Sequence, residues 1–221
     1  MSSYMGLNLL NQMNFLNWKI YLFNDMVIFI ESIIACMVFV FMVNSMYNKN
    51  WTQGFSHWLA LELIWTVSPV LVLLFLGLPS LKLLYLSEIY NFSSHMTVKI
   101  MGHQWYWEYN FPEYNINIMG FPKILSKFIR LGEANILVLP FKMKIRSIIS
   151  SSDVIHSWAL PSMGFKMDAI PGRLNFYMLM FSIPGKFFGQ CSELCGVYHS
   201  WMPIMIESNS ISIFFEWMKT L

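Results

Sequence analysis

MVIFIESIIACMVFVFMV, residues 26–43, is an apolar run that only Glu31 and Ser32 interrupt. A helix needs about 20 mostly apolar residues to cross about 30 Å of hydrocarbon. A second run, from Leu63 to Leu81, carries no charge before Lys82. With their flanks, the two runs predict transmembrane helices over about residues 25–46 and 60–84. Cys36, inside the first run, is interpreted as a small buried hydrophobe.

The composition of the whole chain agrees with insertion in lipid. Of its 221 residues, 56% are apolar and only 12% are charged, which is too apolar for a soluble domain of this size. The formal net charge is only +2, and the sequence has no basic run, so nucleic-acid binding is not indicated. The first twenty residues lack a basic region and a small-residue cleavage site. We therefore interpret residues 1–24 as a retained N-terminal segment, not a signal peptide.

Two spans put both chain ends on one side of the membrane and residues 44–57 on the other. Lys49 is the one firm positive charge of that loop, so the positive-inside rule favours the inner compartment for it. Tyr47, Trp51 and Trp58 fit an aromatic belt at the membrane interface.

From about residue 95 the sequence changes to short stretches rich in Val, Ile, Tyr and Phe, divided by Gly, Pro, Asn and Ser. This pattern predicts an all-β domain over residues 95–221, closed by a helix over 210–220. From residue 91 onward the chain has 11 Lys/Arg and 8 Asp/Glu, against 3 and 4 before it, so the C-terminal part is expected to face water. The predicted strands are TVKIMG (97–102), ANILVLP (134–140), MKIRSIIS (143–150), VIHSWAL (154–160), LNFYMLMF (174–181) and MPIMIES (202–208).

GQCSELCGVYHSWMP, residues 189–203, places Cys191, Cys195, His199 and Met202 close together in sequence. Two thiolates, an imidazole and a thioether form a soft ligand set, which favours copper. Zinc would accept Cys and His but not the thioether, and structural zinc sites usually pair their cysteines as CxxC. On spacing alone, a disulfide between the two cysteines is the alternative.

A mononuclear blue-copper site uses only one cysteine, so two cysteines suggest two coppers bridged by both thiolates. Such a pair requires a second terminal histidine. His156 is the best placed, because DVIHSW is a β-segment ahead of a Pro/Gly loop; its alternative is a strand histidine satisfied by a backbone hydrogen bond. The other candidates are His57, His95 and His103.

Several separate motifs extend this pattern from about Glu62 to Trp217. They are LELIWTVSPV (61–70), LPSLKLLY (78–85), VKIMGHQWYWEY (98–109), SSDVIHSWALPSMGFKMDAIPGRLN (151–175) and GQCSELCGVYHSWMPI (189–204). Together they resemble subunit II of the haem–copper cytochrome c oxidases in its mitochondrial form. The resemblance implies an α+β membrane protein, with a two-helix transmembrane hairpin (residues 25–88) followed by a cupredoxin-like Greek-key β-barrel (residues 95–221).

The resemblance also implies a binuclear copper centre, CuA, whose two ions are bridged by the cysteines. One copper is completed by a histidine and the methionine, and the other by a histidine and a backbone carbonyl. The Glu193 side chain matches a magnesium ligand at the contact with subunit I; a carboxylate suits this hard cation, and the alternative is a solvated loop acid. The implied copper ligands are Cys191 and Cys195 (bridging), His156 with Met202, and His199 with the carbonyl of Glu193.

In this family, reduced cytochrome c docks on the β-domain and gives one electron to CuA, which passes it to haem a in subunit I. Oxygen is reduced in subunit I, at haem a3 and CuB, with coupled proton pumping. The chain is therefore expected to be the electron-accepting subunit of a multi-subunit oxidase. We expect it among other oxidase subunits and lipid in the mitochondrial inner membrane, with the copper domain in the intermembrane space.

Two further roles follow from the resemblance. Trp105, in HQWYWEY, matches the surface indole that receives electrons, whereas Tyr106 is interpreted as packing. Glu62, at the start of the second span, matches the mouth of a proton path into subunit I; its alternative is an acid that stabilises the helix dipole. Glu31 matches no role in the family.

The docking face for cytochrome c is expected to be acidic, because that partner is basic. Residues 110–123, after the aromatic run, hold one acid where many relatives carry several. We therefore expect a smaller ionic contribution to docking, and a shallower dependence of the association rate on salt, than in acid-rich relatives. The candidate docking acids are Glu108, Glu113, Asp153 and Asp168.

Two other functions remain as alternatives. A membrane-anchored copper chaperone of the thioredoxin-like kind uses CxxxC and a distant histidine, but it needs alternating helices and strands and does not need His199 or Met202. A quinol oxidase subunit that has lost copper is the second alternative, and the complete ligand set argues against it.

Overall fold

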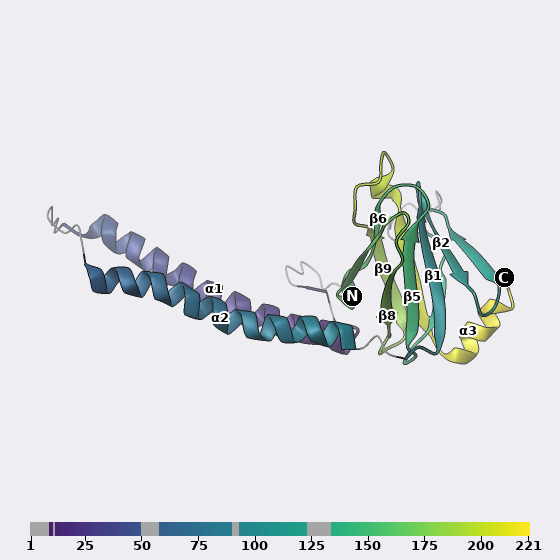
Figure 1. Ribbon diagram of the computed structural model, residues 1–221, viewed down its shortest axis with the longest axis horizontal. Helices are drawn as coiled ribbons and strands as arrows, with labels where there is room; N and C mark the ends of the chain where they lie inside the picture. Colours follow the sequence, from purple (N-terminus) through teal and green to yellow (C-terminus); the bar gives the residue numbers. More distant parts are fainter. Residues whose placement is uncertain (1–8, 11, 50–57, 90–92, 123–133) are drawn as a thin grey trace. The chain divides into compact units, whose positions relative to one another are not determined.

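The computed structural model describes residues 9–10, 12–49, 58–89, 93–122 and 134–221. The chain divides into two compact units (Figure 1). One is helical and comprises Lys19–Leu86; the other comprises Ser87–Leu221 together with Met1–Trp18. Trp51, His57 and most of the predicted loop over 44–57 lie outside the described residues.

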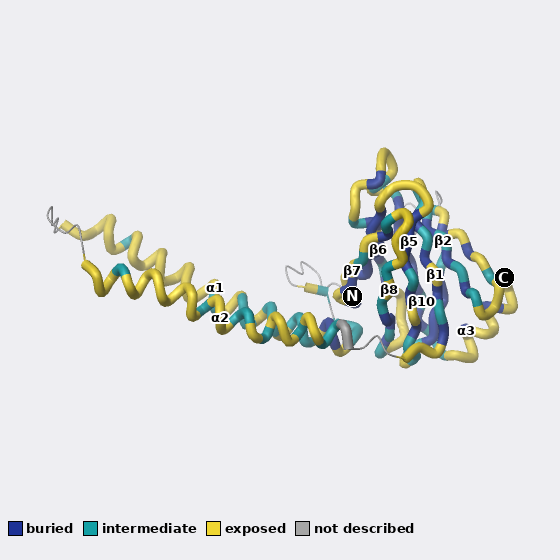
Figure 2. Tube along the Cα trace, viewed as in Figure 1, coloured by how far each residue is buried: buried dark blue, intermediate teal, exposed yellow. Residues whose placement is uncertain are grey.

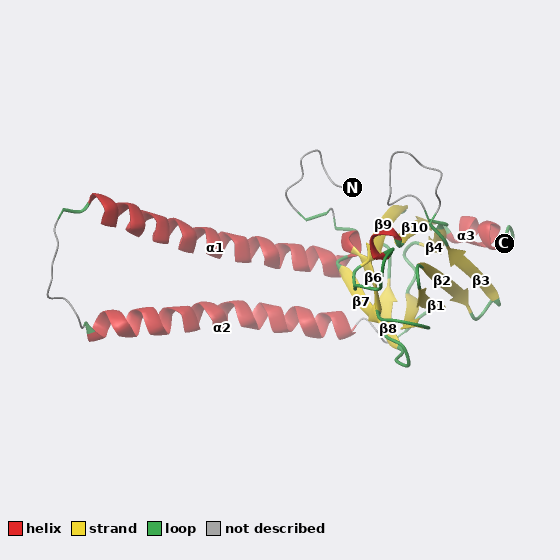
Figure 3. Cartoon of the chain, turned by 90° about the horizontal axis from the view of Figure 1, so that it is seen from above, coloured by secondary structure: helices red, strands yellow, loops and turns green. Residues whose placement is uncertain are grey.

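The helical unit is formed by α1 (Phe15–Tyr47) and α2 (Leu59–Ile89), which run in opposite directions (Figure 3). Their most apolar windows have mean hydropathies of 2.7 and 2.3, and none of either window is buried within the chain. At 33 and 31 residues and 1.5 Å per residue, both helices exceed the thickness of the hydrocarbon layer. Two membrane-spanning helices are therefore confirmed, and the predicted spans fall within them.

The outer surfaces of both helices are apolar over most of their length. Phe29 and Leu73, for example, are 66% and 67% exposed, and Figure 2 shows the same exposure along both helices. The expectation that Cys36 is buried is wrong for the chain alone, because the residue is exposed on α1 and none of the described elements covers it. Pro69 and Pro79 lie inside α2, where each removes a backbone donor, a loss that membrane helices tolerate.

The second unit is a β-sandwich of two five-stranded sheets. In spatial order, the first sheet contains β3 (Ile116–Gly120), β2 (Tyr106–Phe111), β1 (Met96–His103), β5 (Ile145–Ser151) and β8 (Asn175–Leu179). The second contains β4 (Leu137–Pro140), β10 (Pro203–Asn209), β9 (Gly185–Cys191), β6 (His156–Leu160) and β7 (Phe165–Ala169). All pairs are antiparallel except β1 with β5 and β4 with β10.

Side chains that alternate along the strands fill the space between the sheets. In β1 the residues alternate between buried and more exposed positions, as expected for strands with one face on the core. Trp107 of β2 and Trp158 of β6 are both fully buried, and they supply large apolar surfaces from opposite sheets. This arrangement agrees with the predicted all-β domain.

A short helix closes the β-sandwich, as the sequence predicted. Helix α3 (Ile211–Met218) begins after Ser210, whose side chain accepts a hydrogen bond from the backbone N–H of Ile213. This is an ordinary N-cap contact. The helix buries Phe214 and Met218 against the sandwich core.

Residues before the first span pack on the β-sandwich. The Asn17 side chain donates a hydrogen bond of 2.8 Å to the carbonyl oxygen of Ser162, and the backbone of Met13 bonds to both Ser162 and Ser182. Gly164 adopts a φ of +62° beside them, and a side chain there would overlap Asn17. Part of the N-terminal segment is therefore structurally part of the β-sandwich.

Gly189 lies where β9 and the backbone of β6 pass closest to each other. A methyl group added at this position would overlap the carbonyl oxygen of Ala159. Because backbone atoms cannot move aside as a flexible side chain can, we expect Gly189→Ala to destabilise the sandwich by about 3 kcal/mol. Thermal unfolding of the full chain in detergent, followed by near-UV circular dichroism, should give a midpoint about 10 °C lower.

The matched control is Gly172→Ala. No atom lies within 4 Å of a methyl group added there, although the φ of +75° favours glycine. This variant should therefore cost only about 1–2 kcal/mol through its backbone conformation. Equal losses in the two variants would show that the close approach of β6 and β9 is not what Gly189 provides.

Candidate metal centre

The loop between β9 and β10 carries most of the predicted copper ligands. It begins at Cys191, the last residue of β9, and includes a short 3-10 helix over His199–Trp201 before β10 starts. The backbone N–H of Cys191 donates to the carbonyl of Met202 at 3.1 Å, which ties the two ends of the loop together. The backbone N–H of Ser192 donates to the carbonyl of Ser157 at 2.9 Å, so the loop is also attached to β6.

Strand β6 begins at His156, and the pairing of β6 with β9 brings this residue to the loop. The ligand atoms of His156, Cys191 and Cys195 all lie within 4.8 Å of one another, and the three residues are buried. Cys191 Sγ is 3.9 Å from His156 Nδ1 and 3.9 Å from Cys195 Sγ. Cys195 Sγ is in turn 3.5 Å from Nδ1 of His199. Each thiol therefore has its own imidazole neighbour.

The two remaining predicted ligands also lie at this cluster. The backbone carbonyl oxygen of Glu193 is 3.3 Å from Cys191 Sγ, while the carboxylate side chain of Glu193 is on an exposed residue. Met202 is fully buried and its backbone is bonded to Cys191. The structure thus brings His156, Cys191, Cys195, His199 and the Glu193 carbonyl together, and it joins Met202 to them through its backbone.

The geometry of the two thiols fits a bridged metal pair better than a disulfide. Both cysteines are free, and their sulfur separation of 3.9 Å is far above the disulfide length of about 2.05 Å. The separation is also shorter than twice the metal–thiolate bond length of about 2.3 Å, so a single ion can contact both sulfurs. With imidazole and thioether neighbours, the donor set suits copper.

Asp153 holds His156 from the side away from the sulfurs. His156 Nε2–H donates to Asp153 Oδ1 at 2.8 Å, which leaves Nδ1 free to face Cys191. A carboxylate behind a metal-binding imidazole fixes both its tautomer and its orientation. Asp153 also accepts backbone N–H bonds of 2.6 Å from Gln104 and from Val154. Asp153 is predicted as a docking acid, and it is exposed in the structure while it also bonds to His156.

The cluster also changes the proton affinities of its members. Burial opposes ionisation of Cys191, but hydrogen bonds from His156 and from the backbone outweigh it and lower the pKa to about 6. Burial and the neighbouring Cys191 charge raise the pKa of Cys195 to about 12. Burial opposes protonation of His156 as well, yet Cys191 and Asp153 raise its pKa. A metal that binds both sulfurs at neutral pH must therefore displace the proton of Cys195.

Trp105 lies against the ligand loop. It is half-buried in the two-residue turn between β1 and β2, where His103 pairs with Tyr106. A side chain at Gly196 would lie 3.2 Å from its indole Nε1, and the ring of Tyr198 is 5.0 Å away, edge to face. The adjacent Gln104 donates through Nε2 to the carbonyl of Cys195 at 2.8 Å. No local sequence pattern predicts this contact, because Gln104 and Cys195 are 91 positions apart in the chain.

None of the other predicted residues belongs to the described cluster of His156, Cys191 and Cys195. Both ring nitrogens of His103 have other partners, because Nε2 is 3.1 Å from Glu108 Oε2 and Nδ1 is 2.7 Å from Ser152 Oγ. Glu113 accepts the backbone N–H of Thr97 at 2.9 Å, and Asp168 is exposed on β7. Glu62 lies in the first turn of α2.

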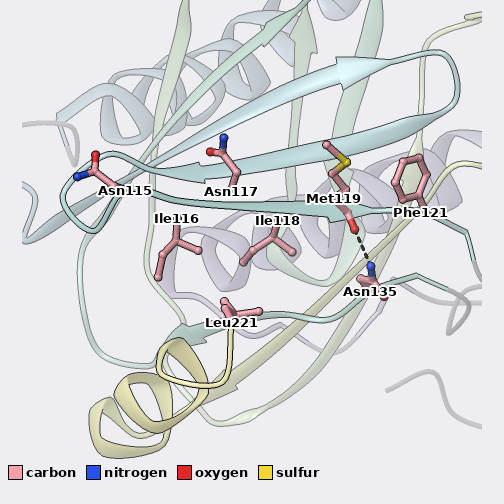
Figure 4. A pocket seen from close by; sticks show the side chains of 8 residues that line it. All are labelled: Asn115, Ile116, Asn117, Ile118, Met119, Phe121, Asn135 and Leu221. Atoms are coloured by element: carbon pink, nitrogen blue, oxygen red, sulfur yellow. Dashed lines mark hydrogen bonds between the residues drawn. The ribbon is translucent and has the colours of Figure 1, made fainter.

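A groove along β3 is separate from the metal cluster (Figure 4). None of its lining side chains titrates, and none is a predicted copper ligand. Its one hydrogen bond drawn in the figure runs from Asn135 to the carbonyl of Met119. The groove is lined by Asn115, Ile116, Asn117, Ile118, Met119, Phe121, Asn135 and Leu221.

Comparisons with family models and with known proteins all point to one family. The family model described as "Cytochrome C oxidase subunit II, periplasmic domain" matches residues 96–209, and the one described as "Cytochrome C oxidase subunit II, transmembrane domain" matches residues 3–83. The chain is 41% identical to cytochrome c oxidase subunit 2 of Yponomeuta malinellus, over 99% of this chain and 98% of that one. It is 44% identical to the same subunit of Apis mellifera ligustica, over 89% of each chain.

Solved structures agree with this result. The periplasmic domain of subunit II of cytochrome oxidase from Bradyrhizobium japonicum matches with a TM-score of 0.56 and 40% identity, over 58% of this chain and 94% of that chain. Subunit II of cytochrome c oxidase in a mixed disulfide intermediate with a thioredoxin-like protein matches with a TM-score of 0.52 and 39% identity, over 58% of this chain and 91% of that chain.

The contact between Asp153 and His156 generates a prediction for copper binding. We expect Asp153→Ala to weaken copper affinity by about 10–100-fold, since the imidazole loses the carboxylate that orients it. Competition with a chelator of known affinity, on the full chain in detergent, measures the change. Asp168→Ala is the control, because it removes an exposed acid that is not bonded to a ligand. Unchanged affinity in Asp153→Ala would mean that packing alone orients His156.

Proposed function

Because the chain belongs to the cytochrome c oxidase subunit II family, we propose that it is the electron-accepting subunit of a respiratory cytochrome c oxidase. It would take electrons from reduced cytochrome c and deliver them to haem a in subunit I for oxygen reduction coupled to proton pumping. The single observation that carries this proposal is the pair of free thiols 3.9 Å apart, each with its own imidazole neighbour.

The residues of the cluster suit the binding of two coppers. Cys191 and Cys195 would bridge them, His156 and Met202 would complete one, and His199 with the carbonyl of Glu193 the other. Two coppers held by these residues would supply a one-electron redox centre. The chain's own part would be to keep the donors in place and shielded from water: Met202 and His156 are fully buried, and Asp153 holds His156 in place.

Rigid ligands favour fast electron transfer, because few atoms then have to change position when the charge of the centre changes. The loop ends are tied by the bond between Cys191 and Met202, and the loop is attached to β6 through Ser192 and Ser157. Gln104 adds a third attachment, to Cys195. These bonds hold the loop in one conformation whether or not an electron arrives.

We assign three further roles, which concern contacts with cytochrome c and with subunit I. Trp105, which packs on the ligand loop, would receive the electron from cytochrome c. The exposed carboxylate of Glu193 would bind magnesium together with groups of subunit I, since a hard cation prefers oxygen ligands. The candidate docking acids are Glu108, Glu113, Asp153 and Asp168, of which Glu113, Asp153 and Asp168 are exposed.

We further propose how the chain lies in the membrane. Residues 25–88 would anchor it in the mitochondrial inner membrane, residues 1–24 would precede the anchor, and residues 95–221 would form the copper domain in the intermembrane space. The loop over 44–57 would then face the matrix. The exposed Tyr47 and Trp58 support an aromatic belt at that interface.

Copper stoichiometry with electron paramagnetic resonance tests the central proposal. The full chain in detergent, loaded with copper, is expected to hold two coppers and to show hyperfine structure from one electron shared equally by both nuclei. One copper with a localised spin, or none, would contradict the proposal and favour a blue-copper carrier, a chaperone or a degenerate subunit.

Glu62 supplies a second test, of the proton path. We expect Glu62→Gln in the assembled oxidase to slow proton-coupled reduction of the haem–copper site, because an amide cannot exchange the proton, while the copper spectrum stays unchanged. Glu31→Gln is the matched control, since it removes a carboxylate from the other helix at a position with no proposed role in the proton path. Unchanged turnover in Glu62→Gln would contradict a role in proton uptake.

A further inference from the structure

Strand β1 of the first sheet packs directly against His156 of the second sheet, and it does so at Gly102. A methyl group added at Gly102 would lie 2.8 Å from Cδ2, 3.0 Å from Cγ and 3.2 Å from Cβ of His156. Carbon atoms in ordinary contact are about 3.5–4.0 Å apart, so a side chain at position 102 would overlap the imidazole. Gly102 does not have a left-handed φ. Space, and not backbone conformation, therefore requires glycine here.

The imidazole of His156 has little freedom to move away from β1. The residue is fully buried, and its Nε2–H donates to Asp153 at 2.8 Å. Its Nδ1 is 3.9 Å from Cys191 Sγ. The indole of Trp107 meets the imidazole edge to face, with ring centroids 5.8 Å apart and planes at 63°. A side chain at Gly102 would therefore have to displace a ring that other contacts hold in place.

Gly102 also anchors the loop between β5 and β6. It lies opposite Trp107 in the β1–β2 pair and opposite Ser151 in the β1–β5 pair. Its carbonyl oxygen accepts the backbone N–H of Ser152 at 3.1 Å and the hydroxyl of Ser151 at 3.3 Å. These two residues directly precede Asp153, so β1 helps to position this carboxylate as well as the imidazole that it orients.

We propose that Gly102 is a positioning residue of the metal centre, which acts through His156. Its bare backbone leaves the space that the imidazole fills, and this contact fixes the position of Nδ1 relative to the cysteine sulfurs. The consequence for copper rests on the proposed function, but the contact itself forms without metal. Because His156 would complete only one of the two coppers, a displaced imidazole would make the two ions unequal.

A double-mutant cycle on the metal-free full chain in detergent tests the contact. Thermal unfolding is followed by near-UV circular dichroism. We expect Gly102→Ala to lower the midpoint by about 5 °C, because the methyl group crowds the imidazole. In the His156→Ala background the ring is gone, so adding Gly102→Ala should lower the midpoint by no more than about 1 °C. Such non-additivity is expected of residues in contact and not of independent ones.

The consequence for the metal is tested on copper-loaded full chain in detergent. We expect Gly102→Ala to weaken copper affinity by about tenfold or more, measured by competition with a chelator. Electron paramagnetic resonance should show the electron shared unequally between the two copper nuclei, because only the copper completed by His156 is disturbed.

Gly120→Ala is the matched control. Gly120 is also a buried strand glycine of the first sheet without a left-handed φ. A methyl group there would lie 3.1 Å from the carbonyl oxygen of Trp107 and 3.2 Å from Cε2 of Tyr109, and neither residue is a predicted ligand. This variant should also lose stability, but its copper affinity and its hyperfine pattern should stay like those of the parent.

Additive losses in the cycle would overturn the inference, because Gly102 would then not act through His156. A parental copper affinity and spectrum in Gly102→Ala would overturn it too. Equal copper effects in Gly102→Ala and Gly120→Ala would assign them to general destabilisation and also contradict it.

The cycle decides the question even where Gly102→Ala alone does not fold. Recovery of folding in the double variant with His156→Ala would support the contact, and continued failure to fold would contradict it. Absence of the two-copper signal in the parent chain would instead contradict the proposed function, and the metal-free cycle would still decide whether Gly102 positions His156.

Discussion

The pairing of β6 with β9 is the constraint on which the metal cluster depends. In this pair Trp158 lies opposite Cys191. Because side chains on a strand alternate between faces, His156, two residues before Trp158, points to the same face and lies just beyond the end of β9. The ligand loop starts at that point. A slip of one residue would turn His156 to the other face and leave Cys191 without its imidazole neighbour.

The same constraint explains why the loop can be short and still be rigid. Both of its ends are strands of one sheet, since β9 pairs with β10 as well as with β6. The loop therefore has only to span the gap between neighbouring strands, and the bond between Cys191 and Met202 closes it. Buried thiols, a buried imidazole and Asp153 then lie close together at the end of the sandwich, where bound metal would neutralise their charge.

Much of the fold and the site could be predicted from local patterns. Each of the six predicted strand segments overlaps a strand, because β-branched and aromatic stretches between turn residues are a local signal. The ligands Cys191 to Met202 were recognisable because they are close in sequence. The prediction of His156 as a ligand required both the strand pattern and the number of ligands that two coppers need. No local pattern indicates that β6 and β9 are neighbours.

Other features depend on contacts that no local pattern reports. Asp153 is an exposed acid, as predicted, but its bond to His156 depends on where the loop before β6 turns, which the sequence does not report. No sequence pattern predicts the contacts of Gln104 and Tyr198, because these contacts form where the β1–β2 turn packs on the ligand loop. The packing of Asn17 on Ser162 joins residues 145 positions apart, so it too required the folded chain.

The two units of the chain shield their apolar side chains from water in opposite ways. The β-sandwich buries Trp107, Trp158 and its other large side chains inside itself, so it can face water. The helices leave residues such as Phe29 and Leu73 exposed, and no other described element of the chain covers them. Since water would not tolerate so much apolar surface, lipid or the helices of other oxidase subunits must complete this unit. The helical unit therefore requires an apolar environment outside the chain, whereas the β-sandwich does not.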